Sequence, residues 1–200
     1  MLTLRGSTGL SRSSVAVLKF RKGENIYMQG DPATDWFEVI SGTVRTCYLY
    51  NDGHRQLTGF YYCGDVFGVD EGHYLSSAEA VTAVALRRHI NGTEQQAVVD
   101  EKPARGALQR ALSSAQACIF LLGRRTAAER VAAFLIAASR RTGIDKPIEL
   151  PMSRSDIADH LGLTIHTVSR TLSEFVRQNL ISLEGPHLIV IQDFNNLDSL

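Results

Sequence analysis

The sequence has no apolar run that approaches the roughly 20 residues needed to cross a bilayer. Its N-terminal segment, MLTLRGSTGLSRSS, has neither the apolar stretch nor the small-residue cleavage pattern of a secretory signal peptide. We therefore expect a cytoplasmic protein that does not contact a membrane. The apolar fraction of 44% and the charged fraction of 21% are typical of a globular protein.

Cysteine is scarce, and its three positions, Cys47, Cys63 and Cys118, are far apart. An odd number of distant cysteines makes a disulfide framework unexpected. No pair has the spacing of a zinc or iron–sulfur site. We expect three free thiols, and the sequence does not reveal whether one of them is redox-active.

The chain also has no net charge, because 21 Lys and Arg residues balance 21 Asp and Glu residues. Nucleic-acid-binding proteins usually carry a basic excess, so this balance argues mildly against that class. From residue 124 to residue 177, however, nine Arg or Lys residues outnumber six Asp or Glu residues. Such a local excess fits DNA binding, and it fits an ordinary solvated face as well.

Histidines are not clustered as a metal site requires. His54, His73 and His89 are 16 to 19 residues apart, and the sequence lacks a His-x-His pair. A cupin-like metalloenzyme, the main alternative from another class, needs converging ligands. No nucleophile–base arrangement stands out either. We therefore expect no enzyme, no metal and no cofactor.

Turn signals divide the first ninety residues into short strands. Asn51-Asp52-Gly53 between alternating segments is a strong hairpin signal. Many short strands at this spacing predict an antiparallel β-roll of the jelly-roll type. The strands are expected at 17–20, 25–28, 36–40, 42–50, 56–60, 66–68 and 81–86.

From about residue 93 to residue 122 the pattern changes to that of a helix, with Pro103 as a break or as part of its first turn. An apolar stripe at steps of three and four fits packing on the roll and equally fits a twofold copy in a dimer. We predict a dimerisation helix from this stripe, which consists of Leu108, Leu112, Ala115, Ile119 and Leu122.

The C-terminal third predicts a winged helix-turn-helix. Thr126 and Glu129 form a capping box for a helix over 126–141, and a short strand follows at 148–150. Two short helices then meet at Gly162, where a left-handed backbone is least costly without Cβ. Thr164 can cap the second helix. A β-hairpin, or wing, is expected from 180–183 and 188–191.

The two short helices have defined faces. The first buries Ile157, Ala158 and Leu161, and the second buries a stripe at helical spacing. The opposite face of the second helix is polar, as in a helix that enters a DNA major groove. An ordinary αα-hairpin with a solvated face fits the pattern too. The predicted buried stripe consists of Val168, Leu172, Phe175 and Val176.

This order of a β-roll, a long helix and a winged helix-turn-helix resembles the Crp/Fnr superfamily of bacterial transcription regulators. The resemblance covers about residues 20–194, and it implies an α+β fold. The implied domains are a sensor-like β-roll at 1–92, a dimerisation helix and hinge at 93–123, and a DNA-binding domain at 124–200. The segments that carry it are 53–60, 64–68, 127–135, 152–158, 161–164 and 167–170.

Within that superfamily the chain looks most like the FixK group, which controls low-oxygen respiration and nitrogen-fixation genes. Like that group, it has no cysteine cluster before Cys47, so an oxygen-sensing iron–sulfur centre is not expected. Cyclic-nucleotide binding in the superfamily needs an arginine inside the roll. No Arg or Lys lies between Arg55 and Arg87 here, and an unpaired buried phosphate is costly.

The resemblance also assigns the DNA contacts. Arg170 would donate two hydrogen bonds to a guanine, Ser169 would touch a thymine, and Ile165 could contact a thymine methyl. His166 stands where the family usually has Glu, so its effect on the recognised sequence is open. The phosphate contacts would be Ser153, Arg154, Thr164 and Thr167.

The expected function is that of a homodimeric regulator that binds a TTGA…TCAA-like palindrome in double-stranded DNA. It would activate genes through RNA polymerase, without a small effector. A roll that binds a small molecule or haem is the alternative, because aromatic residues that would otherwise pack as a core could line a cavity. The regulated genes, the input signal and the choice between activation and repression cannot be read from the residues. The aromatic residues are Phe37, Phe60, Tyr61, Tyr62 and Phe67.

Overall fold

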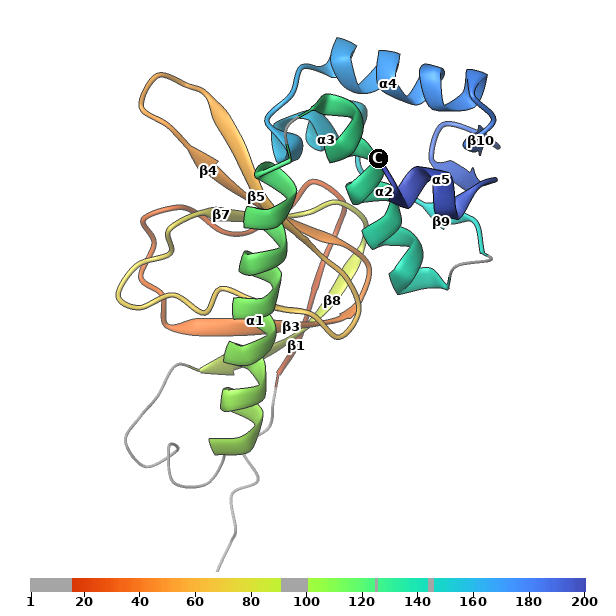
Figure 1. The fold of residues 1–200 in the computed structure, drawn as a ribbon. Helices are drawn as coiled ribbons and strands as arrows, with labels where there is room; N and C mark the ends of the chain where they lie inside the picture. The colour runs from red at the N-terminus through yellow and green to blue at the C-terminus, as the bar shows by residue number, and fades with distance from the viewer. Residues whose placement is uncertain (1–15, 91–100, 125, 144–145) are drawn as a thin grey trace, which may run out of the picture.

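The computed structural model describes residues 16–90, 101–124, 126–143 and 146–200. Its N-terminal part consists of eight strands (Figure 1). Their bounds are β1 Val17–Phe20, β2 Asn25–Tyr27, β3 Asp35–Ser41, β4 Val44–Leu49, β5 Arg55–Tyr61, β6 Val66–Phe67, β7 Ser77–Ala80 and β8 Val84–Ile90.

The strands form two four-stranded antiparallel sheets, in the orders β1-β8-β3-β6 and β2-β7-β4-β5. Apolar side chains that alternate along the strands fill the space between the sheets. The predicted β-roll is therefore confirmed. Its buried centre includes Phe37, Val39, Val44, Ala78 and Leu86.

The predicted hairpin at residues 51–53 is also confirmed. Gly53 has a φ of 84° and donates its N–H to the carbonyl of Tyr50 at 3.0 Å. The strand expected at 81–86 is confirmed only for residues 84–86, which belong to β8, because residues 81–83 form a bend between β7 and β8. Strand β7 was missed because its sequence, SAEA, has no β-branched or aromatic residue to signal a strand.

Helix α1 (Glu101–Leu122) runs along the roll toward the C-terminal domain (Figure 1). Pro103 lies in its first turn, where the missing N–H costs little. The N-terminal part of the predicted helix, residues 93–100, lies outside the described residues.

The C-terminal domain is the predicted winged helix-turn-helix. Its three-stranded sheet has the order β10-β11-β9, and one buried cluster joins the sheet to the helices. Helix α5 was not predicted; Asp193 caps it and Leu197 is buried against the domain. The bounds are α2 Ala127–Thr142, β9 Ile148–Glu149, α3 Arg154–Leu161, α4 Ile165–Arg177, β10 Ile181–Leu183, β11 Leu188–Ile191 and α5 Phe194–Asp198.

In the part of the chain that the structure describes, none of the helices is both long and apolar enough to span a membrane.

Candidate nucleic-acid interface

Helix α3 begins at a capping box. The Ser153 hydroxyl accepts the Asp156 N–H at 3.1 Å, and the Asp156 carboxylate accepts the Ser153 N–H at 3.1 Å. The helix ends at Gly162, whose φ of 61° confirms the predicted left-handed turn. Ile157 and Leu161 are buried as expected, which fixes α3 against the core.

Helix α4 follows directly after this turn. The Thr164 hydroxyl accepts the N–H of Thr167 at 3.1 Å, as predicted for its cap. Val168, Leu172 and Phe175 are each at most 3% exposed. Val176 was wrongly placed in this stripe: it is 41% exposed, because it lies at the edge of the apolar face.

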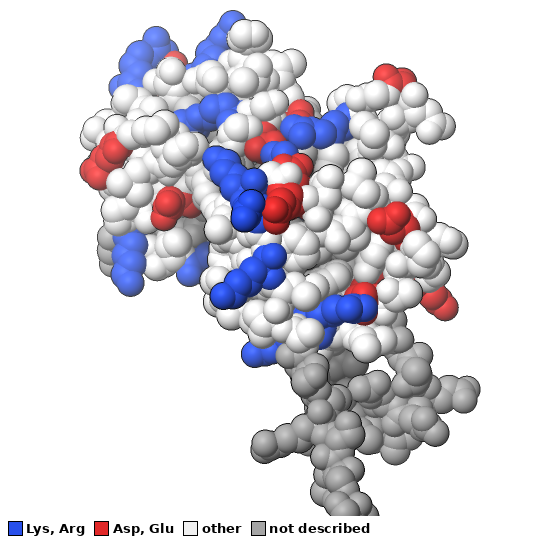
Figure 2. All heavy atoms as spheres, turned by 180° about the vertical axis from the view of Figure 1, so that it is seen from behind, with Lys and Arg blue, Asp and Glu red and all other residues white. Residues whose placement is uncertain are grey.

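The opposite face of α4 is exposed to solvent. All four residues predicted to read bases lie on it: Ile165, His166, Ser169 and Arg170. They recur at helical spacing on a side that the domain core leaves free. Figure 2 shows basic side chains with few acidic ones over the top of the molecule, where the C-terminal domain lies.

The predicted phosphate-binding residues lie at the start of the two helices. Thr164 and Thr167 share a hydroxyl–hydroxyl hydrogen bond of 2.9 Å at the start of α4. The Ser153 hydroxyl donates to Asp156 at 2.8 Å. Arg154 is half-buried, burial lowers the pKa of its guanidinium, and no described residue hydrogen-bonds its buried Nη1. The N-terminus of a helix is an environment that suits phosphate oxygens.

Arg130 was missed in the sequence. Its Nε donates to the carbonyl of Arg124 at 3.0 Å, and its Nη1 donates to the carbonyl of Leu161 at 3.1 Å. One guanidinium thus joins the chain between α1 and α2 to the C-terminal end of α3. No local pattern signals this contact, because Leu161 is 31 positions away.

The stripe of α1 is mostly uncovered. Leu108, Leu112 and Ile119 are 58–68% exposed, and Leu122 is 36% exposed. Ala115 is also exposed and borders the cavity described below. The large side chains of the stripe are therefore not covered by their own roll.

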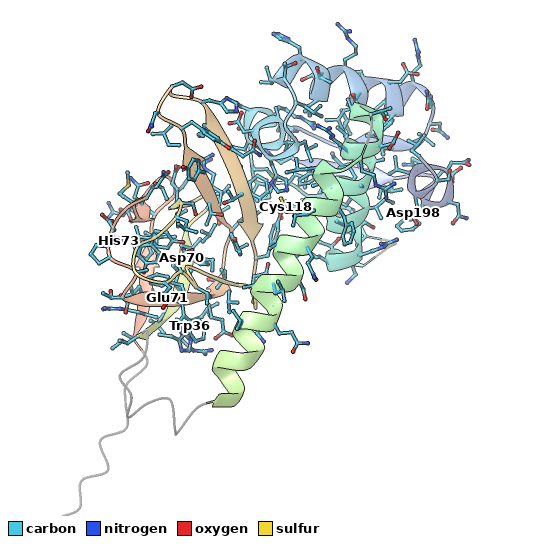
Figure 3. All side chains as sticks on the ribbon, turned by 60° about the vertical axis from the view of Figure 1, so that its left-hand side comes forward. Trp36, Asp70, Glu71, His73, Cys118 and Asp198 are labelled. Atoms are coloured by element: carbon cyan, nitrogen blue, oxygen red, sulfur yellow. The ribbon has the colours of Figure 1, made fainter. Side chains whose placement is uncertain are left out.

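A cavity of about 840 Å³ lies where the roll, α1 and α2 meet (Figure 3). Tyr27, Tyr61 and Asp70 line it from the roll, and Cys118 lines it from α1. Burial raises the pKa of Asp70 and that of the Cys118 thiol. The roll contributes a carboxyl group here and no Arg or Lys to the lining, which is unfavourable for a cyclic phosphate.

The cations of the cavity come from outside the roll. Arg124 and Arg141 line its opposite side. The Nη1 atom of Arg141 lies 2.7 Å from the Asp65 carboxylate, and its guanidinium lies 4.8 Å from the ring centre of Tyr62. Arg141 is thus already paired.

The histidines of the roll do not meet at one point. His89 stacks on Trp36 with ring centres 3.7 Å apart. Among the described residues, no group of three or more His, Cys, Asp or Glu could hold a metal ion. The three cysteines are free.

Comparison with known families gives two matches. Residues 17–89 match the cyclic nucleotide-binding domain, and residues 129–200 match the Crp-like helix-turn-helix domain.

Curated relatives cover nearly the whole chain. The nitrogen fixation regulation protein FixK of Rhizobium meliloti is 38% identical over 188 residues, which are 92% of this chain and 86% of the relative. The protein of the same name in Azorhizobium caulinodans is 39% identical over 191 residues, 90% of this chain and 77% of the relative.

The structure of FixK2 from Bradyrhizobium japonicum is similar, with a TM-score of 0.84 and 38% identity over 92% of this chain and 96% of that one. A CooA variant from Carboxydothermus hydrogenoformans shares the fold, with a TM-score of 0.75 and 23% identity over 92% of this chain and 86% of that one.

Proposed function

We propose a specific role for this chain, which belongs to the Crp/Fnr family of transcription regulators and is of the FixK type. It is a DNA-binding regulator and not an enzyme, so the cupin-like alternative is set aside. Its proposed role is to bind a TTGA…TCAA-like palindrome as a homodimer in the cytoplasm. It would activate low-oxygen or nitrogen-fixation genes through contact with RNA polymerase.

The exposed face of α4 carries this proposal. Arg170 is exposed, so its guanidinium can donate to guanine O6 and N7, and Ser169 and Ile165 lie on the same exposed face. His166 can donate to guanine where a Glu would accept from cytosine, so the outer part of the half-site is where we expect a departure. Thr164, Thr167, Ser153 and Arg154 are the proposed phosphate neighbours that fix the register.

Fluorescence anisotropy with a labelled TTGA…TCAA duplex and a scrambled duplex of equal length tests the role. We expect the palindrome to bind more tightly, in air and without oxygen, with no ligand added. Equal binding of both duplexes would contradict the proposed sequence. Selection from random duplexes would then reveal whether His166 has changed the recognised bases.

The homodimer is proposed from the uncovered stripe of α1. Burial of each large apolar side chain of the stripe against a copy contributes about 1.5–3 kcal/mol. Ile119→Glu would place a charge in the centre of that contact, and we expect monomers in sedimentation velocity. Glu in place of exposed Val17, which lies on the roll, is the matched control. A wild-type chain that sediments as a monomer at micromolar concentration would contradict the dimer.

Activity without a small effector is the final part of the proposed role. Among the described residues, the roll contributes no Arg or Lys to the cavity, which argues against a cyclic nucleotide as the effector. The cavity itself favours a second candidate, a regulator gated by a small molecule or haem. Palindrome affinity measured with cyclic nucleotides and with haem separates the two candidates. A ligand that is required for binding would overturn the effector-free mode. The domain boundaries after residues 92 and 123 stay a prediction.

A further inference from the structure

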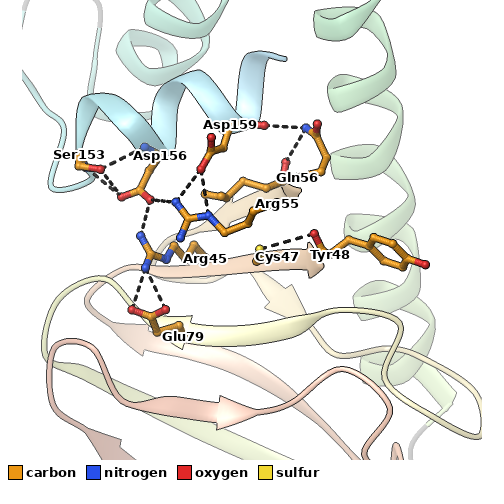
Figure 4. Close-up of polar contacts among 10 residues, drawn as sticks. Arg45, Cys47, Tyr48, Arg55, Gln56, Glu79, Ser153, Asp156 and Asp159 are labelled. Atoms are coloured by element: carbon orange, nitrogen blue, oxygen red, sulfur yellow. Dashed lines mark hydrogen bonds and ion pairs between the residues drawn. The ribbon is translucent and has the colours of Figure 1, made fainter. Parts of the chain in front are cut away.

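Helix α3 is joined to the roll by a group of charged side chains (Figure 4). Arg55 on β5 donates to the Asp159 carboxylate from Nε at 2.9 Å and from Nη2 at 2.6 Å. The same Nη2 lies 3.2 Å from the Asp156 carboxylate. Arg45 on β4 also donates to Asp156. We call Arg45, Arg55, Asp156 and Asp159 the interdomain clamp, because each ion pair connects the roll to the DNA-binding domain.

The clamp has a fixed geometry on the side of the roll. Glu79 on β7 accepts two hydrogen bonds of 2.9 Å from Arg45, so Arg45 is held between two carboxylates. Burial alone would lower the pKa of Arg55, but its hydrogen bond to Asp159 and the nearby carboxylates raise it. Burial raises the pKa of the adjacent Cys47 thiol, so that thiol adds no negative charge at neutral pH. Across the interface the two guanidinium groups of the clamp therefore face its two carboxylates, and Glu79 adds a third carboxylate on the side of the roll.

Asp156 both caps α3 and binds the arginines of the roll. Its Oδ2 atom accepts from the backbone and the hydroxyl of Ser153, which caps α3, while its Oδ1 atom accepts from Arg45 and Arg55. Asp156 is only 4% exposed. The roll therefore holds the first turn of α3 at the residue that shapes that turn, directly beside the proposed phosphate neighbours.

Uncharged contacts extend the same interface along α3. Gln56 donates its side-chain N–H to the carbonyl of Asp159 at 2.7 Å. The Nδ1 atom of His160 lies 3.2 Å from the carbonyl oxygen of Leu57, and its ring centre lies 5.1 Å from that of Phe60. Strand β5 thus follows α3 from its first turn to its last, which restrains rotation as well as translation.

Fixing α3 also fixes the recognition helix. Only residues 162–164 separate α3 from α4, and the two helices share one buried core that includes Leu161 and Val168. The roll has a second buried core of its own, and its Val81, Phe60 and Tyr62 also pack against the core of the helices. The orientation of α4 relative to the roll and α1 therefore depends on the surface between the two domains, and the clamp supplies most of its charged contacts.

We propose that the interdomain clamp is a set of positioning residues for DNA recognition. It holds the DNA-binding domain in one orientation without a bound small molecule, and in the dimer it sets the distance between the two recognition helices. The inference rests on the proposed function, because that distance matters only if two copies read one palindrome. A loosened clamp lets each recognition helix sample other positions, so the duplex-binding orientation is less populated and the apparent affinity falls.

Palindromes whose spacer is shortened or lengthened by one base pair test this role. For Arg55→Ala we expect about tenfold weaker binding to the preferred spacer, as the competent fraction falls to about a tenth. We also expect the preference for that spacer over its neighbours to shrink. Arg55→Asp combined with Asp159→Arg restores an ion pair of reversed direction, and it should recover much of the preference.

Arg87→Ala is the matched control, because Arg87 pairs with Glu38 at 2.6 Å inside the roll. It should keep the wild-type affinity and preference. If Arg55→Ala weakens binding equally for all spacers, or leaves it unchanged, the clamp does not position the helices. If the wild-type chain shows no palindrome preference at all, the proposed function is what fails.

Hydrogen exchange without DNA tests the clamp in that case too. Arg55→Ala should speed amide exchange along the β4–β5 hairpin and in α3, while the buried half of α4 keeps its protection. Faster exchange throughout α3 and α4 would mean that the DNA-binding domain itself is destabilised. Unchanged exchange in α3 would mean that Arg55 does not hold this helix against the roll. Either result overturns the proposal.

Discussion

Helices α3 and α4 start in the same way and use their polar residues in opposite ways. Each begins at a hydroxyl that caps it, Ser153 or Thr164, and each buries an apolar stripe in one shared core. Beyond that core, α3 uses Asp156 and Asp159 to bind arginines of the roll. Helix α4 leaves Ser169 and Arg170 in solvent.

This difference shows how a helix-turn-helix separates support from recognition. The carboxylates of α3 are held within the molecule, so they do not repel DNA phosphates with their full charge. The exposed face of α4 stays free of acidic residues in its first turn, where approach to DNA is closest. We expect substitutions on α3 to change stability and domain orientation, and substitutions on α4 to change sequence preference.

The largest expected effect is on α3. Asp156→Ala removes one side of the α3 capping box and one carboxylate partner of Arg45 and of Arg55, which keep Glu79 and Asp159. Losing hydrogen bonds to charged groups at such a site costs about 1.5–3 kcal/mol. We expect the free energy of unfolding to fall by that amount in urea titrations followed by circular dichroism. Asp198→Ala is the control, because its pair with Arg140 is exposed and worth under about 1 kcal/mol. Equal losses in the two variants would refute the structural role of Asp156.

The sequence predicted those features of the two helices that depend on residues close in sequence. It did not predict contacts between residues far apart in sequence. The caps at Ser153 and Thr164, the turn at Gly162 and the buried stripe of α4 depend on neighbours a few positions away. The ion pair of Arg45 and Asp156 joins residues 111 positions apart, and no local period marks it. Nothing in the sequence around Asp156 and Asp159 indicates that they bind arginines of the roll, which are 111 and 104 positions away.

The strands of the roll show the same difference between local signals and distant contacts. Turn residues such as Gly53 signal a hairpin locally, and the strands beside it were predicted. Strand β7 is defined by pairing with β2 and β4, whereas its own residues have low strand propensity. The helical period alone predicted which face of α4 is exposed, whereas the base-reading roles on that face came from the family resemblance and stay a prediction.

A second effect is expected on α4. Arg170→Ala should remove about 1–3 kcal/mol of discrimination between the palindrome and a duplex with the guanine replaced, because one bidentate contact carries that amount. Anisotropy titrations with both duplexes measure it. Arg177→Ala is the matched control on the same helix, since Arg177 is exposed and pairs with Glu174. It should weaken both duplexes alike, and the base-reading role of Arg170 fails if its own variant does the same.

The smallest expected effect is a pH dependence of stability, which should involve His160 on α3 and not His166 on α4. Burial lowers the pKa of His160 on α3 below its usual 6.5, although its hydrogen bond to Leu57 partly opposes this. The folded chain therefore binds fewer protons than the unfolded chain as pH falls through that value, and stability should decrease. His166 on α4, by contrast, is exposed to solvent.

Melting temperatures at pH 7.5 and pH 5.5 measure this difference. The charged groups near His160 are Asp156 and Asp159 on the same helix, and Arg45 and Arg55, which pair with them from the roll. His160→Gln can still donate to the Leu57 carbonyl but cannot titrate, so its loss of stability on acidification should be smaller than that of the wild type. His166→Gln should lose as much as the wild type. If the melting temperatures of the two variants fall equally on acidification, protonation of His160 does not cause the loss of stability, and His160 contributes to the interface only by packing.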